Sequence, residues 1–125
     1  MIERLNQKKK TEGFIDGKRY LNKKKKLWGY LDGNVAKDKE GYPLLILRED
    51  GVITWNEGEE QGYQKDNKIF FTNGELIYEF LKEKRQIVDR EDRPVLYLQG
   101  STKEIEELNN LDFFGTAAII LELFS

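Results

Sequence analysis

Short runs of apolar residues separated by polar turns fill the middle of the chain, from residue 42 to residue 100. The runs are rich in Ile, Val, Phe, Tyr and Trp, a composition typical of β-strands. Two of the turns contain Asp50-Gly51 and Asn73-Gly74, dipeptides that favour hairpins. The pattern therefore predicts an antiparallel meander in which consecutive strands pair.

The clearest hairpin surrounds Asn73-Gly74 and joins residues 67–72 to residues 75–81. A two-residue turn there would place Phe71 opposite Leu76. Because side chains alternate between the two faces of a strand, one face of this hairpin is expected to belong to the core. That face carries Ile69, Phe71, Leu76, Tyr78 and Phe80.

The C-terminal part contains one predicted helix. Ser101-Thr102-Lys103-Glu104 has the form of a capping box and precedes an apolar stripe, which predicts a helix from about residue 102 to residue 110. Residues 115–124 suit either a helix or a buried strand, and we favour a strand. The expected fold is mainly β: a single antiparallel meander forming a small β-barrel or a strongly curved sheet. One short C-terminal helix follows it, with a final strand as an option for the tail.

Two segments near the N-terminus are alike at a spacing of 16 residues. Residues 13–18 and 29–34 each carry an apolar pair that enters an Asp-Gly turn. Stacked repeat arrays need at least three units to bury a continuous core. With two units recognised, the sequence favours a barrel over a repeat array.

Charge divides the chain unequally. Residues 1–40 contain 12 Lys and Arg against 6 Asp and Glu, a net charge of +6, whereas residues 41–125 contain 9 against 17, a net charge of -8. We expect residues 1–12 to be a basic, flexible N-terminus and residues 13–125 to be a single β-rich domain. The lysines at 8–10 and 23–26 suit contacts with phosphates, but the acidic remainder favours a solvated tail and loop. A nucleic-acid partner is therefore not expected.

The chain contains no His and no Cys, which removes the imidazole acid–base group and the thiolate nucleophile. Carboxylates remain, but those within residues 57–60 and 89–92 lie in predicted turns, where solvated acids are typical. We therefore expect no catalytic residue, no metal site and no cofactor, and we interpret the protein as a binding protein rather than an enzyme.

No apolar run approaches the length of a membrane span, and residues 1–10 lack the apolar stretch of a signal peptide. The sequence thus predicts a cytoplasmic protein without a membrane-spanning segment.

Residues 27–100 carry a succession of aromatic and turn positions: Trp28, Asp50-Gly51, Trp55, Gly62-Tyr63, residues 66–71 and Tyr78. This succession resembles the lipocalin-like small β-barrels of bacteria, of the calycin type. The resemblance implies a barrel that holds a small ligand. Lipocalins tend to begin with Gly-x-Trp, where this chain has Leu27-Trp28-Gly29. Single units of WG-type repeats and of clostridial-type carbohydrate-binding repeats are weaker resemblances.

The aromatic residues define the candidate site. A small barrel can enclose a cavity among inward-facing aromatic side chains. The expected function is non-enzymatic binding of a small apolar molecule among Trp28, Ile53, Trp55, Phe71 and Tyr78. The alternative is a cytoplasmic protein-interaction module, such as an inhibitor or a toxin-neutralising immunity protein. That module would meet a protein partner through its acidic turns or a sheet edge.

Overall fold

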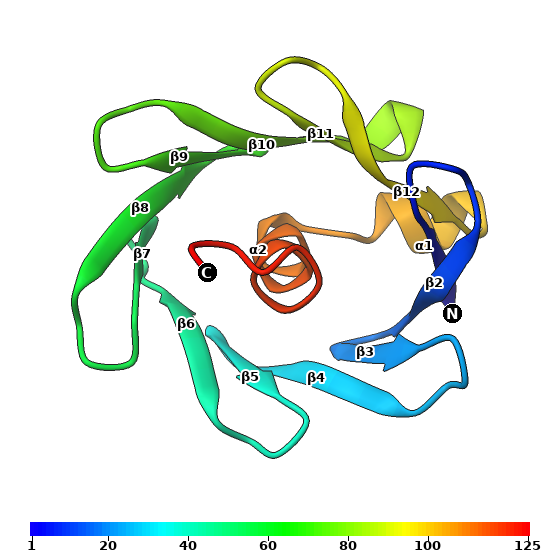
Figure 1. Ribbon diagram of the computed structural model, residues 1–125, viewed down its shortest axis with the longest axis horizontal. Helices are drawn as coiled ribbons and strands as arrows, with labels where there is room; N and C mark the ends of the chain where they lie inside the picture. The colour runs from blue at the N-terminus through cyan, green and yellow to red at the C-terminus, as the bar shows by residue number, and fades with distance from the viewer.

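Twelve antiparallel strands form a closed β-barrel in the structure, a computed structural model that describes residues 1–125 (Figure 1). Each strand pairs with its neighbours in the sequence, and β1 pairs with β12 to close the ring. The predicted fold class, an antiparallel meander that closes into a barrel, is confirmed. The strands are β1 (Ile2–Leu5), β2 (Thr11–Asp16), β3 (Arg19–Asn22), β4 (Leu27–Asp32), β5 (Val35–Asp38), β6 (Pro43–Leu47), β7 (Val52–Thr54), β8 (Glu60–Lys65), β9 (Lys68–Phe71), β10 (Leu76–Leu81), β11 (Gln86–Asp89) and β12 (Pro94–Gln99), with a 3-10 helix, η1 (Lys82–Lys84), between β10 and β11.

Six turns at one end of the barrel, which we call the mouth, share one backbone conformation. In each turn the N–H of the first residue donates to the carbonyl four residues later, and the fourth residue has a φ between 60° and 90°. The two-residue turn expected at Asn73-Gly74 is therefore wrong, because Phe71 N donates to Glu75 O and closes a longer turn. The six turns begin at Asn6, Asn22, Asp38, Trp55, Phe71 and Asp89.

A β-bulge follows every one of these turns. One extra residue enters the strand that leaves the turn, at Glu12, Trp28, Leu44, Gln61, Ile77 and Val95. The intervals between successive turns are 16, 16, 17, 16 and 18 residues, and the intervals between successive bulges are the same. The barrel is thus built from six copies of one hairpin. The two similar segments recognised in the sequence belong to two of these copies.

Two helices follow the strands, and the second runs through the centre of the barrel (Figure 1). α1 (Thr102–Glu106) begins with the predicted capping box of Ser101 and Glu104, and Asn109 then caps α2 (Asn110–Ile119). Residues 112–119 of α2 are all buried. A helix buried on every side is apolar all round, so its sequence resembles that of a buried strand. The final strand favoured for residues 115–124 is therefore wrong.

Polar contacts fix α2 at the end opposite the mouth. Lys18 Nζ forms an ion pair with Asp112 at 2.8 Å, and Tyr20 O–H donates to Asp112 O at 3.1 Å. Gln64 Nε2 donates to Asn110 O at 2.7 Å. Gly115 lets the helix approach the wall closely, because a Cβ there would lie 2.5 Å from the Tyr20 hydroxyl. These contacts set both the depth and the rotation of α2 in the barrel.

The N-terminus forms part of the barrel. Ile2–Leu5 pairs with β2 on one side and β12 on the other, and Ile2 and Arg4 are buried. The segment 1–12, expected to precede the domain as a basic flexible tail, therefore contains the strand that closes the ring. Four residues are too few to show a clear alternation in the sequence, and the lysines that follow belong to the first turn at the mouth.

Gly29 is expected to be essential for seating α2. A Cβ on Gly29 would lie 2.7 Å from Lys37 O and 2.7 Å from Ile119 Cγ2. We expect Gly29→Ala to lower the free energy of unfolding by about 1–3 kcal/mol, as overpacking does, measured by urea denaturation. Gly33→Asn is the control, because Gly33 has a φ of +59° in open space and Asn tolerates that conformation. Equal stability of the two variants would contradict this packing of β4 on α2.

Tyr20 is expected to make the fold sensitive to alkaline pH. Burial raises the pKa of the Tyr20 hydroxyl, whereas the hydroxyl ionises near pH 10 in an unfolded chain. The unfolded chain therefore loses this proton first, and stability present below about pH 10 falls as the pH rises further. Tyr20→Phe should reduce the fall measured by denaturation between about pH 9 and 11, whereas Tyr42→Phe, at an exposed position, should not. An unchanged fall in Tyr20→Phe would exclude this role.

Candidate functional site at the mouth of the barrel

The interior of the barrel is filled by α2. The hydrophobic core joins inward side chains of the strands to five residues of α2: Phe113, Phe114, Ala117, Ala118 and Ile119. The main pockets lie at the ends of the barrel, three at the mouth and two at the opposite end. Ligands or partners therefore have room at the ends of the barrel, and the mouth has more pockets than the opposite end.

The structure separates the five residues expected to hold a ligand. Ile53 is fully buried in the core, whereas Trp28, Trp55 and Phe71 are 48%, 41% and 42% exposed at the mouth. Phe71 and half-buried Tyr78 line one pocket together. Trp28 lines two other pockets, across the mouth from them. The five therefore do not surround one cavity.

Trp55 and Phe71 occupy unusual positions in the repeated hairpin. Four of the six turns at the mouth begin with Asn or Asp, whose side-chain oxygen accepts two backbone N–H groups; Asn22 Oδ1, for example, accepts from Lys24 N at 2.9 Å and Lys26 N at 3.0 Å. Trp55 and Phe71 stand at the same position in the other two turns and have no such acceptor. The turn at Trp55 has neither of these side-chain hydrogen bonds. In the turn at Phe71, Asn73 Oδ1 accepts from Glu75 N at 2.9 Å in place of a first-residue acceptor. Each of the two turns presents a partly exposed aromatic ring at its first position.

A third aromatic ring lies beside Phe71. Gly62 on β8 lies next to β9, the strand that ends in Phe71, and a Cβ on Gly62 would lie 2.6 Å from Phe124 Cζ. The Phe124 ring also packs on Phe71, with centroids 6.0 Å apart and planes tilted by 56°. The C-terminal segment therefore extends the aromatic surface of Phe71 over β8 and β9.

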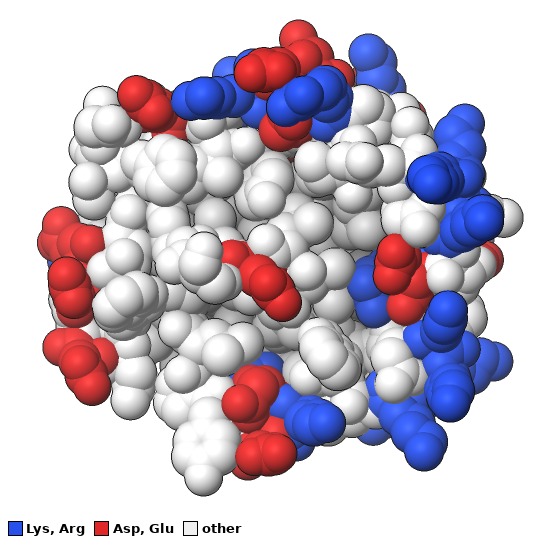
Figure 2. Space-filling model, in the orientation of Figure 1, with Lys and Arg blue, Asp and Glu red and all other residues white.

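The turns around the mouth carry opposite charges on opposite sides. The first two turns contain Lys8, Lys9 and Lys10 and the lysines at 23–26, while the turn across the ring from the first contains Glu57 and Glu59. None of these side chains forms an ion pair. Figure 2 shows basic residues gathered on one side of this face, acidic residues on the opposite side and a largely uncharged centre. We call Trp55, Phe71, Phe124, Glu57 and Glu59 the aromatic–acidic sector.

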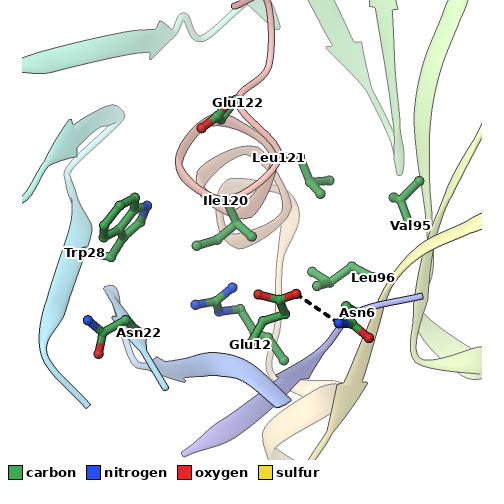
Figure 3. Close-up of a pocket in the computed structure, with 10 residues that line it drawn as sticks. Asn6, Glu12, Asn22, Trp28, Val95, Leu96, Ile120, Leu121 and Glu122 are labelled. Atoms are coloured by element: carbon green, nitrogen blue, oxygen red, sulfur yellow. Dashed lines mark hydrogen bonds between the residues drawn. The ribbon is translucent and has the colours of Figure 1, made fainter. Parts of the chain in front are cut away.

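The basic side of the mouth holds a pocket of about 410 Å³ that sequence reasoning missed (Figure 3). Its polar lining includes Arg4, which is only 4% exposed. Arg4 Nη2 donates to Leu21 O at 2.7 Å, while Arg4 Nε has no partner. Burial lowers the pKa of Arg4. The sequence shows a charged residue, Arg4, in β1, but only the pairing of β1 with its neighbours shows that this residue faces inward.

The carboxylates do not gather into a metal-binding cluster. No group of three or more acidic side chains is close enough together to hold a metal ion. The Asp89 carboxylate accepts from Arg93 N at 3.0 Å and Glu91 N at 2.9 Å, and these backbone hydrogen bonds lower the pKa of Asp89. Asp89 therefore stabilises a turn.

Neither α1 nor α2 has the length and apolar composition that a membrane span requires.

Both tryptophans are expected to be open to solvent. Because Trp28 and Trp55 are 48% and 41% exposed, acrylamide should quench the fluorescence of the single-tryptophan variants Trp28→Phe and Trp55→Phe to similar degrees. Burial of either ring inside the barrel would instead give one strongly protected variant. Thermal denaturation of both variants provides the control that each remains folded.

Comparison of the chain with protein-family models, with curated proteins and with solved structures gave no match in any of the three. The twelve-strand barrel is compatible with a calycin-like architecture, and its function is argued below from the geometry of the mouth.

Proposed function

We propose that this protein is a non-enzymatic interaction module that binds a protein partner through the aromatic–acidic sector. The observation that carries the proposal is the presence of exposed Trp55 and Phe71 where the equivalent turns have Asn or Asp. An aromatic ring at this position cannot accept the two backbone N–H groups that Asn or Asp accepts, and each such hydrogen bond is worth about 1 kcal/mol. The turn at Trp55 lacks both, and the turn at Phe71 regains one through Asn73 Oδ1. Such a local sacrifice of turn stability is typical of residues that serve binding.

The closed ring limits how a partner can attach. Every strand is paired on both sides, so strand addition at a sheet edge, one of the two modes expected from the sequence, has no free edge to use. The acidic turn, which begins at Trp55 and contains Glu57 and Glu59, remains available to a partner. A small apolar ligand enclosed by the barrel, the other function expected from the sequence, has less support because α2 occupies that space.

The chemistry of this sector indicates the kind of partner. Trp, Tyr and Arg are the residues that most often dominate binding energy at interfaces, and they do so where surrounding contacts exclude water. Here Phe71 packs on Phe124, exposed Trp55 begins the neighbouring turn of the mouth, and unpaired Glu57 and Glu59 lie at the rim. A complementary surface would have an apolar centre and a basic border. We therefore propose an inhibitor-like or immunity-type complex with a basic protein.

Replacement of Trp55 or Phe71 by Asn should weaken binding strongly while leaving the turn able to form. We expect each variant to weaken the complex by at least about 2 kcal/mol, roughly a 30-fold rise in Kd, measured by calorimetry with the protein captured by wild type from its source cells. Tyr42→Ser is the matched control, because Tyr42 is a 65% exposed aromatic in a neighbouring turn. Capture that is unaffected by Trp55→Asn and Phe71→Asn would refute the proposal.

Binding should also depend on salt through the acidic rim. We expect the double variant Glu57→Gln and Glu59→Gln to slow association and to flatten the dependence of Kd on ionic strength, because rim charges act mainly on the association rate. The double variant Lys24→Gln and Lys25→Gln, on the basic side of the mouth, serves as the control. A complex that tightens with salt would contradict an acidic interface.

A further inference from the structure

We propose that the pocket beside Trp28 binds a carboxylate carried on an apolar group, with Arg4 as the anion-binding residue. The pocket is formed by the first turns and strands of the ring, by β12 and by residues 120–122, outside the aromatic–acidic sector. It is therefore a separate site, and the proposal goes beyond the protein interaction described above.

Arg4 is a buried cation without a counter-ion. Its guanidinium lies where a side chain at position 13 would be, since a Cβ on Gly13 would clash with Arg4 Nη2. Gly13 thus leaves the space that the guanidinium occupies. Arg4 takes part in no ion pair, and its one hydrogen bond goes to the neutral carbonyl of Leu21. Because an unpaired buried charge is strongly destabilising, a carboxylate from outside would be bound tightly here.

Among the acidic residues, Glu12 acts most strongly on the pKa of Arg4, but its carboxylate is hydrogen-bonded to Asn6. Glu12 Oε1 accepts a hydrogen bond from Asn6 Nδ2 at 3.1 Å (Figure 3), and no ion pair joins Glu12 to Arg4. The Glu12 carboxylate therefore lines the pocket without neutralising the guanidinium. A ligand carboxylate would be repelled by Glu12, so removal of this charge should tighten binding of an anion and weaken binding of a cation.

The remaining walls are largely apolar and suit a ligand with one polar end. Apolar surface comes from Trp28, Val95, Leu96, Ile120 and Leu121, and exposed Glu122 is the second carboxylate of the lining (Figure 3). Asn22 uses its Oδ1 in the turn, which leaves its Nδ2 free to donate to a ligand. The lysines at 8–10 and 23–26 belong to the two turns that flank the pocket, and their positive field would attract anions to the site.

Nuclear magnetic resonance of the full chain tests this site with 3-phenylpropionate and its neutral amide, 3-phenylpropionamide. We expect saturable shifts of the Arg4 Nε–H and Trp28 indole signals with the acid, and affinity for the amide at least about tenfold lower. Glu12→Gln should tighten binding of the acid. A tripeptide with a C-terminal Phe, used as the free acid and as the amide, distinguishes a chain terminus from a small acid as the natural source of the carboxylate. Preference for either acid over its amide supports the site, and the tighter acid identifies the source.

Two variants keep the test independent of folding. Arg4→Met should remove the preference for acid over amide, and Trp28→Ala should weaken both probes while Arg4 is retained; thermal denaturation reports whether each variant folds. Equal affinity for acid and amide in the wild-type protein, no saturable shift with any probe, or weaker acid binding in Glu12→Gln would each overturn the proposal. None of these results depends on Trp55 or Phe71, so the proposed protein interaction is tested separately.

Discussion

The packing of α2 against the inner wall of the barrel is the contact on which the rest of the structure depends. A ring of eight strands is just wide enough to be filled by its own side chains, and twelve strands enclose a wider space. Phe113 and Phe114 supply bulk near the start of α2, while Gly29 and Gly115 allow helix and wall to approach closely. With the centre occupied, the exposed surface available for binding lies at the ends of the barrel and on its outer wall.

Repetition of one hairpin explains how the mouth acquires different chemistry around its rim. Each bulge lies six residues after the first residue of its turn, whichever residue begins the turn. The backbone of the hairpin is therefore the same with different side chains at the rim. Asn or Asp at the first position stabilises four turns, and Trp55 and Phe71 begin the other two. Comparing equivalent positions within one chain therefore separates residues that hold a turn from residues that the turn presents to solvent.

The sequence predicted the strands well and their inward faces less well. Alternation of apolar and polar residues identified the meander, but each bulge shifts the alternation by one residue, and Trp28 is itself such a bulge residue, so it lies at the rim instead of inside. Phe71 lies at the rim because β9 ends there and the turn begins. The tail was misinterpreted because an apolar run that is buried on all sides has no period to distinguish helix from strand. Arg4 was missed because a four-residue strand gives too short a pattern. The candidate site thus depended on pairings between residues far apart in the sequence.

The two sides of the mouth are connected by the end of the chain. Residues 120–122 wall the pocket that contains Arg4, and Phe124, two residues further on, covers Gly62 and packs on Phe71. Glu122 and Phe124 both have positive φ, which few non-glycine residues adopt without support from their surroundings. A group that displaced residues 120–122 would therefore also disturb the aromatic surface on the acidic side. By thermodynamic linkage, any such effect of one site on the other must act equally in both directions.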